Sequence, residues 1–440
     1  MAAHERKKIV IVGGGFAGVN AARELARLLP RAEDGHITIV DQNNFHLFTP
    51  MLTEVAGGMV DTRHILNPIR RLSPRVTFEQ GRVEKIDLAR KSVEVTIGDA
   101  ANGVPEDGRT LEADHLVIAL GSVTDDRRIP GVREHAVMVK SVGDAAAIRN
   151  RALELLDRAD AEDDPDKRHA LLTFVVGGGG YTGVETLAAV NDLVRESIKR
   201  YPRLDEKEVR AVIVEPVGRL MPEISAGLAR YAQKKLEERG VEVIFKELTE
   251  AGPDHVTLKD GTRIPTYLFV WAGGVTPAPL IKDLDCRHGK HGAITVDACM
   301  AVPDHEGVWA LGDCAEVPGK GGKPYAPTAQ NAQREGVQVA RNIAATLGGE
   351  RPAPFVYTPI GELALVGKRS GVASVYGLRF SGFIAWAMWR AVYLGKTPLW
   401  EKRVRILFDW TLDLIFGDEI AQLPTARSVS PAARGALEKE

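Results

Sequence analysis

Apolar residues gather into short β-branched runs, each followed by a glycine-rich turn and then by a helical pattern. Residues 8–12 (KIVIV) form the first run, which is typical of a strand buried in a parallel sheet. A glycine-rich turn at 13–18 follows, and apolar residues recur at helical spacing over 21–28. A second apolar run at 37–40 ends in Asp41. This order of strand, turn, helix, strand and acid predicts a dinucleotide-binding fold.

The glycines of the turn have separate roles in the predicted fold. Gly13 permits the tight turn, Gly15 lets the backbone approach a pyrophosphate, and Gly18 lets helix and strand pack closely. The helix N-terminus offers free N–H groups and the positive end of its dipole to the phosphates. Asp41 can accept hydrogen bonds from a ribose. Glycine-rich turns are common, so it is the strand, helix and acid in order that favour nucleotide binding.

The same pattern occurs again in the middle of the chain. A strand over 172–176 leads into a glycine-rich turn at 178–183, a helix follows, and a strand over 209–214 ends in Glu215. An acid at this place favours NADH, because it repels the 2′-phosphate of NADPH. Arg219 lies four residues on and would weaken that preference.

Strand-like patterns outside the two repeats complete the first fold. Residues 76–97 predict a hairpin or meander, 111–120 predict a strand that enters a turn, and strand patterns resume over 294–313. The sequence therefore predicts an α/β protein with two Rossmann-like domains, the second inserted in the first. The charged segment 157–168 is interpreted as a solvated connection, or alternatively as an extension of the preceding helix.

Composition and charge exclude several classes of protein. The 440 residues exceed what one hydrophobic core usually supports, so two or three domains are expected. With 44% hydrophobic and 26% charged residues, the chain is neither disordered nor collagen-like. A net charge of −2 gives no basic field for nucleic acid, which is therefore not an expected partner.

Cysteines and apolar segments narrow the choice further. Cys286, Cys299 and Cys314 are an odd number without CxxC spacing, which argues against a disulfide framework and a four-cysteine metal site. The charged start lacks the apolar stretch of a signal peptide, which predicts a cytoplasmic protein. The longest apolar candidate, 382–395, is shorter than a membrane span and contains Arg390.

Residues 380–416 contain two apolar stripes at helical spacing. Trp386, Trp389 and Tyr393 are the kinds of aromatic residue favoured at bilayer interfaces. The stripes therefore predict helices that lie on a membrane, or alternatively helices that pack on the protein core or form a dimer interface. The basic residues that would meet anionic headgroups are Arg390, Lys396, Lys402, Arg403 and Arg405.

The layout resembles the two-dinucleotide-binding flavoproteins and, within them, type II NADH dehydrogenase, the single-subunit NADH:quinone oxidoreductase. In the superfamily, the aspartate of a Gly-Asp pair, here Asp313, contacts the ribityl–phosphate region of FAD. Tyr181 departs from the family, which often has proline there, and Arg334 stands where many members have a second glutamine. The segments that carry the resemblance are FHLFTPML at 45–52, TGVE at 182–185, FVWAGGVTP at 269–277, PTAQ at 327–330 and GFIAW at 382–386.

The resemblance and the two repeats together imply the binding residues and domains. Those expected for FAD are Gly13, Gly14, Gly15, Phe16, Ala17, Gly18, Asp41, Gln42, Thr49, Pro50, Val83, Gly121, Asp313, Ala329, Gln330 and Arg390. Those expected for NADH are Gly178, Gly180, Tyr181, Gly183, Glu185, Glu215, Gly273 and Gly274. The expected domains are the FAD domain (1–156 and 286–350), the NAD(H) domain (170–285) and the C-terminal region (351–440).

Three residues are implied to act at the site. Glu185 would relay a proton to the reduced quinone, or alternatively cap or salt-bridge its helix. Gln330 would hydrogen-bond a quinone carbonyl or the flavin, or alternatively cap a helix. Arg390 would lie near the flavin, or alternatively on the surface. No metal and no protein nucleophile is required.

The prediction is a peripheral enzyme of the respiratory chain on the cytoplasmic face of the membrane, which reduces a membrane quinone with NADH through FAD. It would pump no protons, because nothing in the sequence spans the membrane, and a homodimer is compatible with the tail. Three alternatives stay open. A sulfide:quinone oxidoreductase generally needs paired cysteines, a soluble ferredoxin or rubredoxin reductase needs no aromatic tail, and an NADH-sensing flavoprotein would not turn over.

Overall fold

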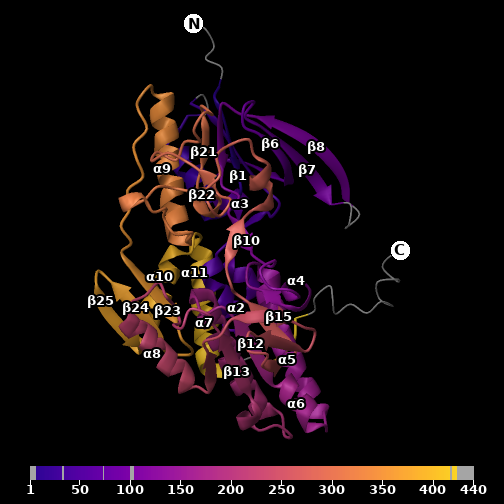
Figure 1. Cartoon of the computed structure of the whole chain (residues 1–440). Helices are drawn as coiled ribbons and strands as arrows, with labels where there is room; N and C mark the ends of the chain where they lie inside the picture. Colours follow the sequence, from indigo (N-terminus) through magenta and orange to yellow (C-terminus); the bar gives the residue numbers. More distant parts are fainter. Residues whose placement is uncertain (1–5, 32–33, 73, 100–103, 417–418, 424–440) are drawn as a thin grey trace. The chain divides into compact units, whose positions relative to one another are not determined.

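The computed structural model describes residues 6–31, 34–72, 74–99, 104–416 and 419–423. The chain forms two compact units, each made of three segments of the sequence. Unit 1 comprises 1–47, 66–123 and 275–359, and unit 2 comprises 48–65, 124–274 and 360–440. Figure 1 labels the elements and colours them along the sequence.

A five-stranded parallel sheet forms the centre of unit 1, in the order β21-β9-β1-β2-β5. The late strand β21 pairs with β9, so the chain returns to the first sheet after completing another one, as the sequence predicts. These strands are β1 (Lys8–Val12), β2 (His36–Asp41), β5 (Thr77–Gln80), β9 (His115–Ile118) and β21 (Val308–Ala310).

Helix α1 (Phe16–Leu28) follows β1, and α9 (Ala329–Leu347) packs closely on it. A Cβ at Gly336 would come within 2.3 Å of the Ala17 carbonyl oxygen, so only glycine permits this contact. The predicted meander is confirmed by an antiparallel sheet of β6 (Arg82–Asp87), β7 (Ser92–Asp99) and β8 (Val104–Glu112). The smaller elements of unit 1 are β3 (Phe45–Leu47), β4 (Leu66–Pro68), α3 (Ile69–Leu72), β10 (Ser122–Thr124), β19 (Val275–Pro277), β20 (Ile294–Thr295) and β22 (Ala315–Glu316).

The predicted strand over 111–120 is interrupted. β8 ends at Glu112 and β9 begins at His115, with Asp114 between them. The Asp114 carboxylate accepts hydrogen bonds from Lys8 N at 2.8 Å and from Lys7 Nζ at 2.9 Å, which fixes the turn beside β1.

Unit 2 contains the second parallel sheet, in the order β11-β18-β12-β13-β14. Its strands are β11 (Val137–Met138), β12 (Thr173–Gly177), β13 (Arg210–Val214), β14 (Val241–Ile244) and β18 (Leu268–Trp271). An antiparallel sheet consists of β15 (Leu248–Ala251), β16 (His255–Leu258) and β17 (Arg263–Pro265). The helices are α2 (Leu52–Ala56), α4 (Val132–His135), α5 (Val142–Ala161), α6 (Pro165–Leu171), α7 (Tyr181–Ser197) and α8 (Ala226–Glu237).

The alternative that 157–168 extends the preceding helix is correct over 157–161, and the rest of the segment leads into a separate helix, α6. α5 continues to Ala161, and Asp164 caps α6 by accepting a hydrogen bond from Asp166 N at 3.0 Å. Charged residues occupy the exposed faces of these helices, while Leu155 and Leu156 are fully buried. The charge therefore marks a solvated helix face and not a linker.

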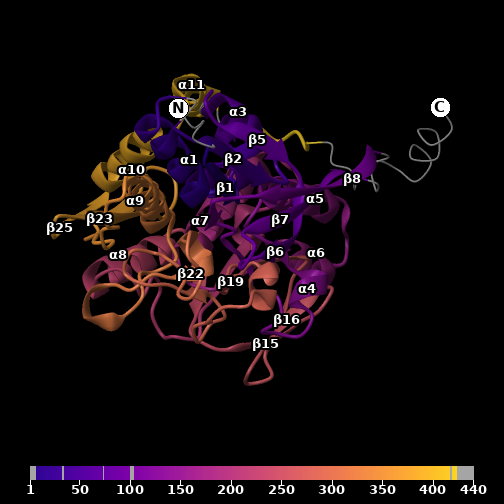
Figure 2. The same cartoon turned by 90° about the horizontal axis from the view of Figure 1, so that it is seen from above.

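The last part of unit 2 is an antiparallel sheet followed by two helices. The strands are β23 (Gly361–Leu365), β24 (Gly371–Val375) and β25 (Leu378–Gly382), and the helices are α10 (Phe383–Lys396) and α11 (Trp400–Phe416). The helices confirm the two predicted stripes from Phe383 onward. Residues 380–382 belong to β25, and the sheet was not predicted. α10 lies beside this sheet in Figures 1 and 2. Among the described residues, no helix is long and apolar enough to cross a membrane.

Candidate functional site

The first glycine-rich turn in unit 1 shows why each of its glycines is needed. Gly13 has a φ of +111°, and a Cβ there would lie 2.2 Å from the Ala119 carbonyl oxygen. A Cβ at Gly18 would lie 1.9 Å from the Gly13 carbonyl oxygen. By contrast, no atom of the described residues lies within 4 Å of a Cβ at Gly15. Gly13 and Gly18 thus serve packing, and Gly15 leaves space for a phosphate at the N-terminus of α1.

Asp41 at the end of β2 is fixed against this turn. Its carboxylate accepts hydrogen bonds from Gly14 N at 2.6 Å and from Asn43 N at 2.7 Å. The His46 ring contacts the same turn, with its Nδ1 atom 3.2 Å from the Gly14 carbonyl oxygen. Burial lowers the pKa of His46 to about 4, so the ring is neutral at pH 7.

Asp313 and Gly121 follow β21 and β9, at the carboxyl edge of the same sheet. Ser122 Oγ donates a hydrogen bond to Asp313 Oδ2 at 2.6 Å, which orients the carboxylate. Behind it, Glu335 of α9 accepts a hydrogen bond from Gly312 N at 2.7 Å, and burial raises the pKa of Glu335 to about 7. Open α/β sheets bind ligands at this edge, so these residues could hold a dinucleotide together with the Gly13 turn.

Gln330 lies in the first turn of α9 but does not cap the helix, so the capping alternative is wrong. Thr328 is the capping residue, whose Oγ1 accepts a hydrogen bond from Asn331 N at 3.3 Å. The Gln330 side-chain amide instead donates to the Tyr357 hydroxyl. Its role toward flavin or quinone remains a prediction.

The second glycine-rich turn, in unit 2, repeats the geometry of the first. Gly178 has a φ of +108°, and a Cβ at Gly183 would lie 1.8 Å from the Gly178 carbonyl oxygen. At Gly180, the nearest atom to a Cβ is Glu223 Oε1, at 3.9 Å. As in unit 1, two glycines serve packing and one leaves room for a phosphate above the start of α7.

Glu215, the acid that ends β13, has both carboxylate oxygens at this turn. It accepts hydrogen bonds from Gly179 N at 2.6 Å and from Val217 N at 2.8 Å. Arg219 donates to the Pro222 carbonyl oxygen at 2.5 Å. Gly274 follows β18 at the same edge of the sheet, with a φ of +120°. Gly178, Glu215 and Gly274, which are predicted to bind NADH, thus lie at one edge of the sheet.

Glu185 is the fifth residue of α7, shortly after the glycine-rich turn. Its Oε1 accepts a hydrogen bond from Leu365 N at 2.8 Å, so Glu185 is bound to β23 and does not cap its own helix. Burial, together with the nearby charge of Glu54, raises the pKa of Glu185 to about 8. At neutral pH this carboxyl group therefore carries a proton that it can donate.

Arg390 is buried, so the alternative of a surface role is wrong. Its guanidinium lies between the rings of Trp386 and Trp410, with Cζ at 4.2 and 4.6 Å from the ring centroids. The Glu54 side chain is 1% exposed. Its Oε2 lies 3.9 Å from Arg390 Nη2 and accepts a hydrogen bond from Trp410 Nε1 at 2.5 Å. Sequence reasoning missed Glu54 and Trp410. A lone acid within the apolar segment LTEVA is the signal that could have revealed Glu54.

The predicted FAD residues are divided between the two units. Thr49, Pro50 and Arg390 belong to unit 2, together with the predicted NADH residues, whereas Asp313 and Gln330 belong to unit 1. The other predicted FAD residues also lie in unit 1.

Comparison with known proteins identifies the family. Residues 7–336 match the pyridine nucleotide-disulphide oxidoreductase family, and residues 360–419 match the NDH2 C-terminal domain. The chain is 31% identical over 426 residues to the type II NADH:quinone oxidoreductase of Mycobacterium tuberculosis, which covers 93% of this chain and 88% of that relative. The chain belongs to the type II NADH:quinone oxidoreductase family.

Other relatives agree with this membership. A probable NADH dehydrogenase of Dictyostelium discoideum is 32% identical over 424 residues, which are 95% of this chain and 91% of that relative. The fold is similar to that of NDH2 from Plasmodium falciparum, solved in complex with NADH, with a TM-score of 0.85 and 19% identity. That similarity covers 95% of this chain and all of the solved one.

Within this type II NADH:quinone oxidoreductase family member, we expect the Glu215→Gln variant to discriminate less between NADH and NADPH. Losing the carboxylate removes a charged hydrogen-bond acceptor for the ribose and the repulsion of a 2′-phosphate. We predict that kcat/KM for NADH falls about tenfold while that for NADPH changes less. Steady-state kinetics with both nucleotides measure this. The control is Glu242→Gln on β14, and an unchanged ratio of the two kcat/KM values would contradict the assignment of Glu215.

Proposed function

We propose that this chain transfers electrons from NADH through bound FAD to a membrane quinone, without pumping protons. FAD, when bound, accepts two electrons from NADH and can pass them on singly or in pairs. The two glycine-rich turns, at the carboxyl edges of the two parallel sheets, supply the phosphate-binding geometry that two dinucleotides need.

The observation that carries the proposal is the contact between Glu185 and β23. Glu185 follows the turn predicted to hold NADH, and Leu365 belongs to the segment that matches the NDH2 C-terminal domain. This contact joins an acid of the nucleotide domain to the region that is characteristic of the quinone-reducing family. Reduction of a quinone by NADH consumes one proton besides the hydride, and a carboxyl group protonated at neutral pH can supply it.

Steady-state assays with alternative substrates test the proposal. The FAD-loaded protein should oxidise NADH rapidly with a soluble quinone, and slowly or not at all with ferredoxin. Sulfide in place of NADH should not reduce the quinone. Rapid sulfide oxidation, or reduction of ferredoxin in preference to quinone, would overturn the proposal.

We also propose that α11 lies on the bilayer at the cytoplasmic face of the membrane. Its outward side chains include several large apolar ones, with Leu407 52%, Phe408 63% and Ile415 66% exposed. Its inward face buries Ile406 and Trp410 and also holds two paired acids. Asp409 accepts a hydrogen bond from His64 Nδ1 at 2.5 Å, and Asp413 pairs with Lys368 at 3.3 Å. A helix that pairs its acids on the inward face and exposes several large apolar side chains on the other is matched to lipid.

The Leu407→Glu/Phe408→Glu double variant tests the membrane surface. Each of these side chains contributes about 1.5–3 kcal/mol when fully buried in an apolar medium, so binding to lipid vesicles should weaken at least about a hundredfold. Reduction of a soluble quinone should be unchanged. Vesicle co-sedimentation measures the binding, and Val104→Glu on β8 serves as an exposed control. Unchanged vesicle binding with a shift from dimer to monomer would instead favour an interface between two copies.

A further inference from the structure

A small cavity lies against one face of α7 in unit 2. Glu185 and Asp192 are seven residues apart and therefore face the same side of the helix, with Ala188 and Ala189 between them. The cavity has a volume of about 10 Å³, which suits one water molecule. Its remaining walls include Thr53 and Glu54 of α2, Leu365 of β23, Lys368 after that strand, and Trp386 of α10.

Two buried polar atoms of the cavity wall lack protein partners. Thr53 Oγ1 and Glu54 Oε1 make no hydrogen bond to any of the described residues. Buried polar atoms are rarely left unsatisfied, and an ordered water is the usual partner in a polar cavity of this size. A water here would have the hydroxyl of Thr53 and the carboxyl groups of Glu54 and Glu185 as partners.

The two oxygens of Glu54 differ in what they contact. Oε2 accepts the indole N–H of Trp410 at 2.5 Å and lies 3.9 Å from Arg390 Nη2, so it is the oxygen that the protein stabilises as an anion. Oε1 is the oxygen that can carry a proton or bind water. The charged groups that act on Glu54 are Arg390 of α10, Asp413 of α11, Lys368 after β23 and Glu185 of α7.

We propose that Glu54 is the proton donor that restores Glu185 after each turnover, through a water in the cavity between them. The inference rests on the proposed quinone reduction. Glu185 gives its proton to an oxygen of the reduced quinone and becomes a carboxylate. The O–H bond of Glu54 then breaks as a proton passes to the water, and a proton of that water forms the new O–H bond of Glu185. Glu54 is left as a carboxylate beside Arg390 and Trp410, which stabilise its charge.

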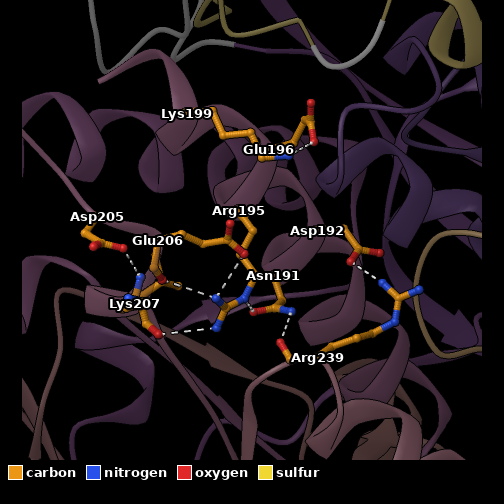
Figure 3. Close-up of polar contacts among 10 residues, drawn as sticks. Asn191, Asp192, Arg195, Glu196, Lys199, Asp205, Glu206, Lys207 and Arg239 are labelled. Atoms are coloured by element: carbon orange, nitrogen blue, oxygen red, sulfur yellow. Dashed lines mark hydrogen bonds and ion pairs between the residues drawn. The ribbon is translucent and has the colours of Figure 1, made fainter. Parts of the chain in front are cut away.

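Asp192 connects the cavity to solvent, so that Glu54 can recover its proton. Asp192 and Lys368 line both the cavity and a surface pocket of about 450 Å³. Figure 3 shows the Asp192 carboxylate pointing toward the Arg239 guanidinium. Arg239 Nη1 donates a hydrogen bond to Asp192 Oδ1 at 2.5 Å. Burial also raises the pKa of Asp192, which favours its holding a proton. One proton per turnover enters from this pocket and replaces the proton that the quinone takes up, so the protein gains no net proton.

The test compares the first turnover with the steady state in the FAD-loaded Glu54→Gln variant. Glu185 begins the first turnover protonated, so stopped-flow reoxidation of the reduced enzyme by a soluble quinone should stay within about twofold of wild type. Later turnovers need Glu54, so the steady-state rate should fall about tenfold and show a larger solvent deuterium isotope effect. A purely structural role would slow both phases equally, and that outcome, or an unchanged steady state, overturns the proposal.

A second variant keeps the test decisive if Glu54→Gln does not fold. Trp410→Phe keeps a ring beside Arg390 but removes the N–H that binds Glu54 Oε2. In this variant the rate of the first turnover should stay close to wild type, whereas the steady-state rate should fall about threefold. A wild-type steady state in Trp410→Phe overturns the proposal. Glu237→Gln, an exposed carboxylate on α8, is the matched control and should behave as wild type.

Infrared titration separates failure of this inference from failure of the proposed function. The carbonyl band of protonated carboxyl groups can be followed against pH in the FAD-loaded protein without quinone. If the two groups are coupled, Glu54→Gln removes one protonated carboxyl and also shifts the titration of Glu185. An unshifted Glu185 overturns the coupling, whereas a wild-type enzyme that reduces no quinone overturns only the proposed function.

Discussion

The Glu185→Gln variant should reoxidise its reduced flavin with quinone about a hundredfold more slowly than wild type. The carboxyl group that carries a proton at neutral pH becomes an amide, which cannot act as an acid, and positioned acids typically contribute 10²–10⁴-fold. Reduction of the flavin by NADH should remain within about twofold, because hydride transfer needs no proton from Glu185. Anaerobic stopped-flow absorbance measures the two half-reactions separately.

The pH dependence adds an independent check on Glu185. Burial raises the pKa of this carboxyl from 4.5 to about 8, so its protonated form dominates below pH 8 and is lost above it. Quinone reduction by wild type should therefore fall above about pH 8, and the variant should lack this inflection. Glu362→Gln, a partly buried carboxyl on β23, is the control. Equal slowing of both half-reactions in Glu185→Gln would contradict a role in proton delivery.

The Gly15→Val variant should fold but purify without FAD. A side chain at Gly15 meets no atom of the described residues within 4 Å, and its φ of −74° suits any residue. The added atoms would occupy the place where a phosphate approaches the N-terminus of α1. Losing two charged hydrogen bonds costs about 3–6 kcal/mol, so the affinity for FAD should fall at least a hundredfold. Flavin absorbance of the purified protein and titration of the apoprotein measure this.

Gly18→Ala is the matched control for Gly15→Val. A Cβ there would lie 1.9 Å from the Gly13 carbonyl oxygen, so the backbone of the turn must move. Its apoprotein should lose about 1–3 kcal/mol of unfolding free energy, whereas the Gly15→Val apoprotein should unfold like wild type. Retention of FAD by Gly15→Val would show that the phosphates lie elsewhere.

Features encoded within a few residues were predictable from the sequence. The glycine-rich turns depend on backbone geometry that only glycine permits, so Gly13 and Gly178 could be interpreted from the sequence alone. The parallel strands were visible as apolar runs, and the return of β21 to the first sheet followed from the strand pattern around residue 308.

Contacts between distant parts of the chain were not predictable from periodicity. Glu54 and Trp410 are 356 residues apart, and neither lies in a recognisable motif. Trp389 of α10 was predicted to lie at a bilayer interface, yet it is buried, and so is Trp410 of α11. Gln330 was interpreted without its partner Tyr357, because the intervening loop gives no periodic signal.

Surface charge was the main source of wrong interpretation. The acids and bases over 157–168 look like a linker, but they coat one side of α5 and α6 while leucines at the other side are buried. The strands over 361–382 were missed because they are short and strongly polar in places, as in Leu378–Gly382.

Anaerobic mixing of the purified, FAD-loaded protein with NADH and then with a soluble quinone tests the central claim most directly. NADH should bleach the flavin absorbance at a rate much higher than with NADPH, and quinone should restore the absorbance fast enough to account for steady-state turnover. A flavin that NADH bleaches but quinone does not restore would contradict quinone reduction and point to a different electron acceptor.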